Sequence, residues 1–367
     1  MRKIKLKELA SYNKGQQING NMLLNEGKYE YLNGGINPSG KWNEYNVEGN
    51  TIAISEGGNS CGYVNYMNRN FWCGAHCYYL FNIKCNVKYL FYNLKYNERR
   101  LQNIRSGACM PNIKKKELGE FEIFIDEDIK IQNKIASYLD RISYIMQNRK
   151  KQIEELDELI KSQFVEMFGD INTNTKNFNS MLLKECCTKI TDGTHDTPKR
   201  YNSGVLLITG KNIRENGFDL SNIEYVSEED HKKIYSRCNP EKGDILYTNI
   251  GVNYCTAMIN SLDIEFSMKN VALLKPDYNK INSFYFSYAL NYMKNKIVEL
   301  NKGAGAQTFI GLSAISEIII PIPSITLQNK FAEFVKQIDK QKFEIQKSLE
   351  EMQLLQESLM NKYFGEM

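Results

Sequence analysis

Residues 131–169 read IQNKIASYLDRISYIMQNRKKQIEELDELIKSQFVEMFG, and residues 327–365 read LQNKFAEFVKQIDKQKFEIQKSLEEMQLLQESLMNKYFG. The second stretch aligns with the first without a gap, and both begin in Gln-Asn-Lys and close on Phe-Gly. Self-similarity at a fixed offset is the sequence sign of a repeated structural unit. We therefore expect one element to occur twice, with a different globular segment preceding each copy.

Both stretches have the apolar period of a long helix. Apolar residues recur in alternating steps of four and three over positions 135–167, and again over positions 331–363. A mean step of 3.5 residues is the period of a coiled-coil seam. At 1.5 Å per residue, a helix of about 35 residues is roughly 50 Å long. The polar residues that interrupt the two seams are Arg149, Gln163, Lys342 and Gln356.

The ends of the two stretches carry capping residues. Asp128 precedes the first helix, and Ser324 or Thr326 precedes the second, where each could accept a hydrogen bond from the first turn. The glycine of each closing Phe-Gly suits a helix C-cap. Because each helix has a single apolar stripe, we expect the two to bury their stripes on each other as an antiparallel coiled coil. The alternative is that each packs on its own domain or on another chain.

The segments outside the helices have an α+β texture. Short β-rich runs bounded by Gly and Asn predict strands at 51–55, 63–66 and 77–81, and again at 205–208, 244–248 and 270–274. Each segment also has one probable helix, at 87–105 and 281–300. We therefore expect two mixed α/β domains on a related plan, separated by the two helices of a pseudo-two-fold internal repeat. The expected boundaries are 1–126 for the first domain, 127–170 for the first helix, 171–323 for the second domain and 324–367 for the second helix.

Composition favours a soluble intracellular chain and is compatible with a polyanionic partner. Residues 1–110 carry 14 Lys and Arg against 7 Asp and Glu, whereas residues 181–300 balance at 15 against 15. A basic first domain is compatible with DNA, although ordinary surface charge explains it equally well. The nine cysteines are irregularly spaced, which is typical of a reduced, cytoplasmic protein. Since the N-terminus does not read as a signal peptide and no long apolar run occurs, we expect no membrane association.

Several strings, in this order, resemble the specificity subunit of type I restriction-modification systems. The second domain has Thr191-Asp192-Gly193-Thr194-His195-Asp196-Thr197-Pro198, similar to the family's Asp-Gly-x-His-x-Thr-Pro, and the strand Lys242-Gly243-Asp244-Ile245-Leu246. The second helix is entered through Ile320-Pro321-Ile322-Pro323, like the family's proline-flanked entry. The first copy departs from this pattern with Ile125-Asp126-Glu127, which puts the hinge into the first helix in doubt. The resemblance extends over essentially the whole chain.

The resemblance implies a function in host defence by DNA methylation and restriction. Each globular segment would be a target-recognition domain that reads one half of a split, asymmetric site in double-stranded DNA. The paired helices would fix the gap between the halves and dock two methyltransferase subunits, and through them the restriction subunits. S-adenosylmethionine, ATP and Mg²⁺ would belong to those partner subunits, and this chain would hold no cofactor.

Base reading needs donors and acceptors on loops that can reach base edges, with cations or amides on phosphates. Polar, glycine-rich loops supply such residues in both domains, and for each of them an ordinary solvated loop residue is the alternative. His195 could donate to a base or simply brace its loop. The candidates are Tyr31, Asn33, Ser39, Lys41, Trp42, Asn59, Ser60 and Tyr63 in the first domain and Thr194, His195, Thr197, Lys199, Arg200, Lys211, Asn212, Arg214, Asn249 and Asn253 in the second.

Catalytic motifs were sought and not found in the sequence. An amino-methyltransferase needs an Asp/Asn-Pro-Pro-aromatic loop, but Pro38 is followed by Ser39 and Pro240 by Glu241. A Gly-x-Gly-x-x-Gly opening a helix is also missing. The spacing of Cys73, His76, Cys77 and Cys85 favours buried thiols over zinc. We therefore expect a non-catalytic subunit, and keep two alternatives: a self-contained DNA methyltransferase or nuclease, and a coiled-coil adaptor without a DNA role.

Overall fold

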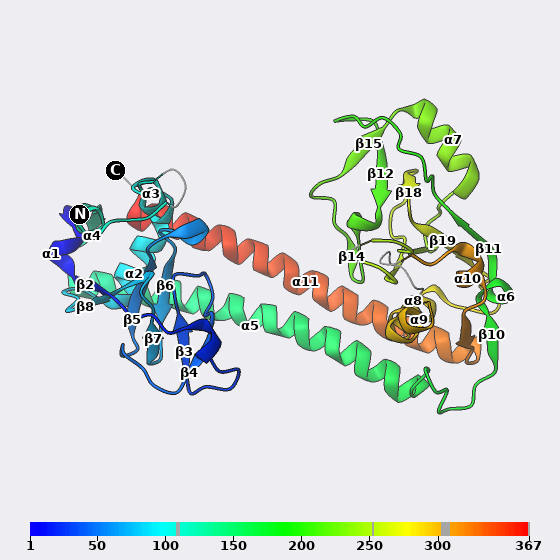
Figure 1. The fold of residues 1–367 in the computed structure, drawn as a ribbon, viewed down its shortest axis with the longest axis horizontal. Coiled ribbons are helices and arrows are strands. Elements are labelled where there is room, and N and C mark those ends of the chain that lie inside the picture. The colour runs from blue at the N-terminus through cyan, green and yellow to red at the C-terminus, as the bar shows by residue number, and fades with distance from the viewer. Residues whose placement is uncertain (108–110, 252, 302–308, 366–367) are drawn as a thin grey trace. The chain divides into compact units, whose positions relative to one another are not determined.

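The computed structural model describes residues 1–107, 111–251, 253–301 and 309–365. The chain forms two compact units, shown in Figure 1. Unit 1 comprises Met1–Gln152 and Ile345–Met367, and unit 2 comprises Ile153–Glu344. Each unit therefore combines one globular segment with part of each long helix.

The two long helices expected from the repeat are present. Helix α5 spans Ile129–Phe168 and begins in unit 1, whereas α11 spans Ile325–Phe364 and begins in unit 2. Asp128 Oδ1 accepts from the backbone N–H of Lys130, and Ser324 Oγ accepts at 3.4 Å from that of Leu327, so these two residues cap the helices. Gly169 closes α5 with a φ of 69°.

Unit 1 is built from short strands and helices that precede or flank α5. Its strands are β1 (Arg2–Lys5), β2 (Ser11–Lys14), β3 (Tyr29–Leu32), β4 (Gly40–Trp42), β5 (Thr51–Ser55), β6 (Val64–Met67), β7 (Phe71–Cys73), β8 (Cys77–Phe81) and β9 (Glu122–Ile125). Its short helices are α1 (Leu6–Leu9), η1 (Gly20–Met22), η2 (Gly58–Ser60), α2 (Val87–Tyr96), α3 (Glu98–Asn103) and α4 (Lys115–Glu120).

Unit 2 has the corresponding elements between α5 and α11. Its strands are β10 (Ser180–Leu182), β11 (Cys187–Asp192), β12 (Val205–Thr209), β13 (Ile213–Arg214), β14 (Gly217–Phe218), β15 (Glu224–Val226), β16 (Ile245–Tyr247), β17 (Ala257–Ile259), β18 (Ser267–Lys269), β19 (Ala272–Pro276) and β20 (Ile319–Pro321). Its short helices are α6 (Leu183–Cys186), η3 (Gly210–Asn212), α7 (Glu228–Cys238), α8 (Ser283–Tyr292), α9 (Lys294–Leu300) and α10 (Leu312–Ser316).

The two units share one sheet topology. The larger sheet has the order β2-β8-β5-β6 in unit 1 and β11-β19-β16-β17 in unit 2. A second sheet has the order β4-β3-β7 in one and β15-β12-β18 in the other. In both, the central strand pairs antiparallel with one neighbour and parallel with the other. The expected α+β fold with an internal repeat is thus confirmed in the backbone, where the sequences of the globular segments have diverged.

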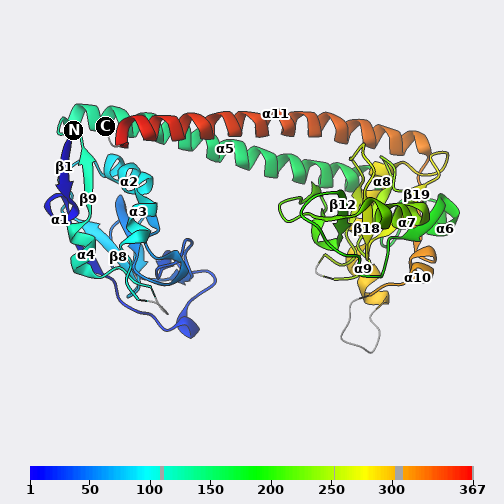
Figure 2. The same cartoon turned by 90° about the horizontal axis from the view of Figure 1, so that it is seen from above.

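The core of each unit includes the start of one long helix and the end of the other. In unit 1, Leu139 of α5 and Phe364 of α11 belong to the same hydrophobic cluster. The ring centroids of Phe364 and Tyr89 lie 5.3 Å apart. Figure 2 shows these helix ends together beside α2. In unit 2, Phe168 of α5 packs against Phe331 of α11, with their ring centroids 5.5 Å apart. Within each unit the two helices therefore run antiparallel.

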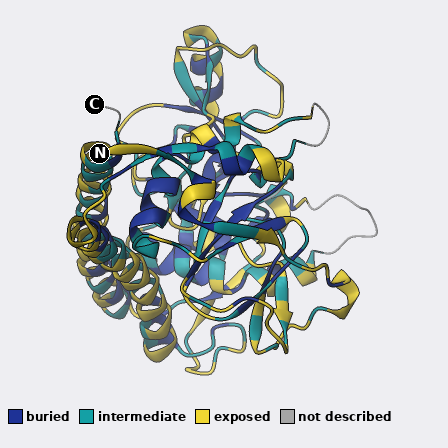
Figure 3. Ribbon diagram, turned by 90° about the vertical axis from the view of Figure 1, so that its left-hand side faces the viewer, coloured by how far each residue is buried: buried dark blue, intermediate teal, exposed yellow. Residues whose placement is uncertain are grey.

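The seam positions predicted from the heptad period are buried or half-buried in both helices, and the outer faces are exposed, as Figure 3 illustrates. Two of the polar interruptions have partners across the seam. Gln356 Nε2 donates to Ser143 Oγ at 2.8 Å in unit 1, and Lys342 pairs with Asp157 at 2.5 Å in unit 2. Polar seam contacts of this kind fix the register of paired helices.

The helix expected over 87–105 is divided in two, and so is the helix expected over 281–300. The breaks fall at Asn97, between α2 and α3, and at Met293, between α8 and α9. Buried Asn97 donates its side-chain amide to the backbone oxygen of Asn93 at 2.9 Å. Asparagine side chains compete in this way with the helix backbone. Nothing in the structure gives a comparable reason at Met293.

Candidate nucleic-acid interface

A pair of parallel strands ends at a polar rim in each unit. In unit 1, Leu32 of β3 lies opposite Cys73 of β7, and in unit 2, Thr209 of β12 lies opposite Lys269 of β18. We call residues 33–41, 56–63 and 74–77 rim 1. Rim 2 comprises residues 193–200, 209–224, 249–253 and 269–270, of which 252 lies outside the described residues. These rims contain most of the residues proposed from the sequence.

Rim 2 brings four of those residues to one pocket of about 410 Å³. Asn253 fixes the backbone beside the pocket, because its side-chain amide donates at 2.9 Å to the backbone oxygens of both Gly210 and Ile213. The pocket walls carry hydroxyl, amide, carboxylate and cationic groups, which is the mixture needed to satisfy base edges. The lining residues are Thr209, Lys211, Asn212, Arg214, Asp219, Ser221, Asn222, Glu224 and Asn253.

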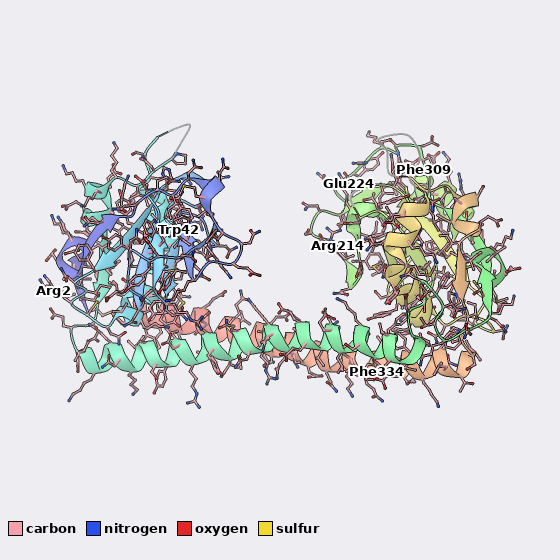
Figure 4. All side chains as sticks on the ribbon, turned by 60° about the horizontal axis from the view of Figure 1, so that its bottom comes forward. Arg2, Trp42, Arg214, Glu224, Phe309 and Phe334 are labelled. Atoms are coloured by element: carbon pink, nitrogen blue, oxygen red, sulfur yellow. The ribbon has the colours of Figure 1, made fainter. Side chains whose placement is uncertain are left out.

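The charged groups of this pocket are held in different ways. Arg214 donates to the backbone oxygen of Lys211 at 2.7 Å and pairs with Asp219 at 2.9 Å. Hydrogen bonds from Ser221, followed by the charge of Arg214, lower the pKa of the Asp219 carboxyl. Figure 4 labels Arg214 and Glu224 on this part of unit 2, and Glu224 pairs with Arg200. In the described part of the chain Lys211 has no ion-pair partner, so its ammonium is available to a ligand.

The loop after β11 is fixed by a network around His195. His195 Nε2 lies 2.7 Å from Asp192 Oδ2 and its Nδ1 lies 3.2 Å from Asn270 Oδ1. Asp192 is buried and also pairs with Arg237 at 2.6 Å. Both ring nitrogens are therefore engaged, which supports the bracing role over donation to a base. On the same loop Thr194 is half-buried, Lys199 is exposed, and Thr197 Oγ1 accepts from Lys269.

Rim 1 is assembled around a glycine turn. The backbone oxygen of Gly34 accepts from Ser60 Oγ at 2.6 Å and also from Ser55. Asn33 Oδ1 accepts from the backbone N–H of His76 at 3.2 Å. Gly34 has a φ of 82°, and a Cβ there would lie 2.4 Å from the His76 oxygen. Only glycine therefore allows the two loops to meet this closely.

The remaining candidates of the first domain lie around this turn. Ser39 and Asn59 are exposed, and Lys41 is exposed on β4, where Trp42 is half-buried (Figure 4). Tyr63 is half-buried with the ammonium of Lys95 3.6 Å from its ring centroid.

Three candidates are buried. The hydroxyl of buried Tyr31 accepts from the backbone N–H of Ile18, and burial raises the pKa of Tyr31. Asn212 is buried and caps its own turn, where its Oδ1 accepts from the backbone N–H of Thr209. Asn249 is 1% exposed and donates to the backbone oxygen of Ile310 at 3.4 Å. In this conformation these three side chains serve packing, which their type and loop context did not predict.

Sequence reasoning missed Lys269, Ser221 and Asn222. Lys269 ends the short strand β18, Ser267–Lys269, where a lysine reads as an exposed terminal charge. Only the parallel pairing of β12 with β18, a long-range contact, brings it to the rim. Ser221 and Asn222 follow the β13–β14 hairpin. The chain after this hairpin hydrogen-bonds back to η3 between Asp219 and Asn212, which is a contact that the local sequence does not predict. The signal that could have found them is the run of polar residues from Asp219 to Asn222.

The four residues weighed as a zinc site do not lie in a common polar cluster. Cys73 and Cys77 are buried in β7 and β8, and hydrogen bonding between the two thiols raises the pKa of Cys73. Burial raises the pKa of Cys85 to about 11. His76 is exposed on rim 1. Among the described residues, no group of three or more His, Cys, Asp or Glu side chains is arranged to hold a metal ion.

Comparisons with known proteins agree with this architecture. The described helices include none that is long and apolar enough to cross a membrane. The family described as type I restriction modification DNA specificity domain matches residues 1–156 and 175–354. A Mycoplasma genitalium chain named as a type I specificity subunit is 28% identical over 98% of this chain and 92% of its own length.

Two further similarities cover most of the chain. The specificity subunit of a type I restriction enzyme from Methanocaldococcus jannaschii is 24% identical over 83% of this chain and 72% of its own length. The crystal structure of a type I restriction-modification S subunit from M. genitalium matches with a TM-score of 0.70 and 25% identity, covering 100% of this chain and 96% of that one. Because the family match takes in both repeats, the chain belongs to the type I restriction-modification DNA specificity family and is a specificity subunit of such a system.

Proposed function

We propose that this chain is the non-catalytic subunit that selects the DNA target, with rim 1 reading one half of a bipartite site and rim 2 the other. One observation carries the proposal: the same sheet topology occurs twice, but the rims carry different side chains. Rim 1 offers Asn33, Ser60 and Lys41, and rim 2 offers Lys211 and Arg214. A common frame with different polar groups fits an asymmetric site in double-stranded DNA.

The proposal includes a spacer and docking role for the long helices. A helix pair of defined register would fix the gap between the two half-sites, as rigid elements do in other DNA-binding proteins. Large apolar side chains also remain exposed off the seam: Tyr144 is 64%, Phe343 67% and Leu354 66% exposed. Tyr144 lies on α5, and Phe343 and Leu354 lie on α11, so each would lose exposed apolar area when a partner protein covers these helices. We assign this surface to two methyltransferase subunits, which would carry the restriction subunits.

Catalysis would then reside in those partners, in the cytoplasm. S-adenosylmethionine would bind the methyltransferase subunits, and ATP and Mg²⁺ would serve the restriction subunits. The unequal charge of the two segments predicts that rim 1 gains more from phosphates and rim 2 more from hydrogen bonds.

The test is protection of DNA by the assembled complex. With its methyltransferase subunits, the chain should protect a bipartite sequence and direct methylation to it. The purified chain alone should transfer no methyl group from S-adenosylmethionine. Methyl transfer by the chain alone would instead favour a self-contained enzyme, and a complex that protects no bipartite site would favour an adaptor without a DNA role.

A further inference from the structure

We propose that Lys269 contacts DNA directly and completes the readout of rim 2, an inference that rests on the proposed function. Lys269 ends β18, and its side chain is 9% exposed. Its ammonium donates to Thr197 Oγ1, a neutral hydroxyl. None of the described carboxylates forms an ion pair with it.

This arrangement leaves the charge of Lys269 incompletely compensated. A buried ammonium is normally paired or bonded by several acceptors, because desolvation otherwise costs free energy. The nearby lysine of unit 2, Lys275, shows the usual solution: it pairs with Asp244 at 2.7 Å and with Glu241 at 3.0 Å. Asp192, the last residue of β11, is already shared by His195 and Arg237.

The position of Lys269 indicates that the acceptor its ammonium lacks is supplied at rim 2, the surface proposed to face DNA. It pairs in register with Thr209, which lines the pocket of rim 2. Its partner Thr197 lies on the exposed loop braced by His195 and Asn270. Lys269 therefore joins the two parts of rim 2, the braced loop and the pocket.

The corresponding place in unit 1 is filled differently. The backbone N–H of Gln16 donates to Cys73 as that of Thr194 donates to Met268, so that Gly74 corresponds to Lys269. A Cβ on Gly74 would lie 2.1 Å from Asn33 Oδ1, which means that the asparagine occupies the space. The frame is thus kept while a long cation in one unit is replaced by a glycine in the other. Such a difference is expected of a position that sets sequence preference.

The ligand chemistry is an acceptor atom of DNA, and two sources are possible. A phosphate oxygen would take the ammonium as a charge, whereas the O6 and N7 atoms of guanine would take it as a base-specific donor. The two sources differ in salt dependence. Loss of one phosphate contact reduces the slope of log affinity against log salt by about one, uniformly across sequences. Loss of a base contact relaxes preference at one position.

The experiment compares Lys269→Met with the wild-type chain, each assembled with its methyltransferase subunits, on duplexes that vary each base pair of the bipartite site. We expect affinity for the cognate duplex to fall about 5- to 150-fold. A smaller salt slope with unchanged preference identifies a phosphate, and relaxed preference at one position of one half-site identifies a guanine. Lys233→Met is the control, since Lys233 is an exposed lysine of α7 paired with Glu229, and it should bind as wild type.

Lys269→Gln provides a second variant with a neutral donor if the methionine variant does not fold. It should lose the salt slope or the preference in the same way. Wild-type affinity, slope and preference in both variants, while the wild-type complex protects its site, would overturn the role of Lys269 and leave the proposed function standing. A wild-type complex that protects no bipartite site would overturn both.

Discussion

Side-chain amide hydrogen bonds explain why the same pair, a buried Gln and an exposed Asn, recurs near the start of both long helices. Gln132 Oε1 accepts from the backbone N–H of Asn86 at 2.9 Å, and Gln328 Oε1 accepts from that of Asn282 at 2.8 Å. Asn133 and Asn329 add a second bond to the same cap residues, at 2.7 and 2.9 Å. Each pair therefore fastens the start of a long helix to the N-cap of α2 or α8. This clamp also settles the first hinge: Gln132 donates at 2.7 Å to the Asp126 oxygen although the prolines are missing there.

Truncation of this clamp should be costly. Gln328 is fully buried and donates to the backbone oxygens of Lys280 and Pro323 as well. Gln328→Ala should lower the free energy of unfolding by about 3 kcal/mol, because buried backbone groups lose their partners. Denaturant unfolding followed by circular dichroism measures this. Exposed Gln337 on the same helix is the control, and an equal loss in Gln337→Ala would contradict the clamp.

The carboxylate of Glu120 at the surface predicts that the stability of the protein depends on pH in the acid range. Hydrogen bonds from Lys5, then from Lys7, lower the pKa of Glu120 to about 2 from its ordinary 4.5. A lowered pKa means that this contribution is complete above pH 4.5 and disappears as the pH falls towards 2. Glu120→Gln should therefore melt slightly below wild type at pH 7, and the difference should shrink below pH 4.5. Exposed Glu351→Gln should show no such trend; a difference that grows in acid would refute the assignment.

At the residue scale, the sequence indicated which polar side chains the loops carry but not which of them face the solvent. Lys211, Arg214 and Asn253, proposed for their polar context, line one pocket of rim 2. Tyr31 and Asn212 belong to equally polar stretches but point inward, because strand register and turn closure decide which way a side chain faces. Lys269 was not among the candidates, because only its pairing with β12, far away in the sequence, brings it to rim 2.

At the scale of elements, the apolar period predicted most of what the structure contains. Every seam position over 135–167 and 331–363 is buried or half-buried. A long periodic helix is visible in its local sequence, whereas the break at Asn97 depends on one buried amide. The pairing of each helix end with a different unit could not be read from periodicity, which specifies a stripe and not its partner.

Because the two long helices are paired, residues inserted into both helices should have a different effect on the DNA gap and on stability from residues inserted into one. The unit boundary falls after Gln152 in α5 and after Glu344 in α11. Seven residues inserted in both helices at these points keep the apolar stripes in phase and add about 10 Å of helix. The protected site should then have a gap about three base pairs longer, at 3.4 Å per base pair. Footprinting of the assembled complex measures the gap.

Insertion into α5 alone serves as the matched control. It leaves α11 unchanged, so the seam contacts of Ser143 with Gln356 and of Asp157 with Lys342 cannot both be kept. We expect a lower melting temperature and weaker protection for this variant. An unchanged gap in the doubly inserted chain would remove the spacer role of the helices.

At the scale of the whole molecule, the chain is one frame used twice. The frame comprises the repeated sheets, the Gln-Asn clamp and the closing Phe, which packs on Tyr285 in unit 2 and on Tyr89 in unit 1. The repeat in the helices and the texture of the two globular segments predicted two domains on a related plan, but their common strand order is not visible in the diverged sequences. The units differ on the rims and also in α7, Glu228–Cys238, which has no counterpart between β4 and β5 of unit 1.

The most direct test of this account is an exchange of one domain. Residues 175–310 would be replaced by the corresponding segment of another family member, and the methylated sites in cells carrying the chain with its partner subunits would be mapped by sequencing. The account predicts that one half-site changes while the other half-site and the gap stay the same. Changes in both half-sites, or in neither, would contradict the division of reading between the two rims.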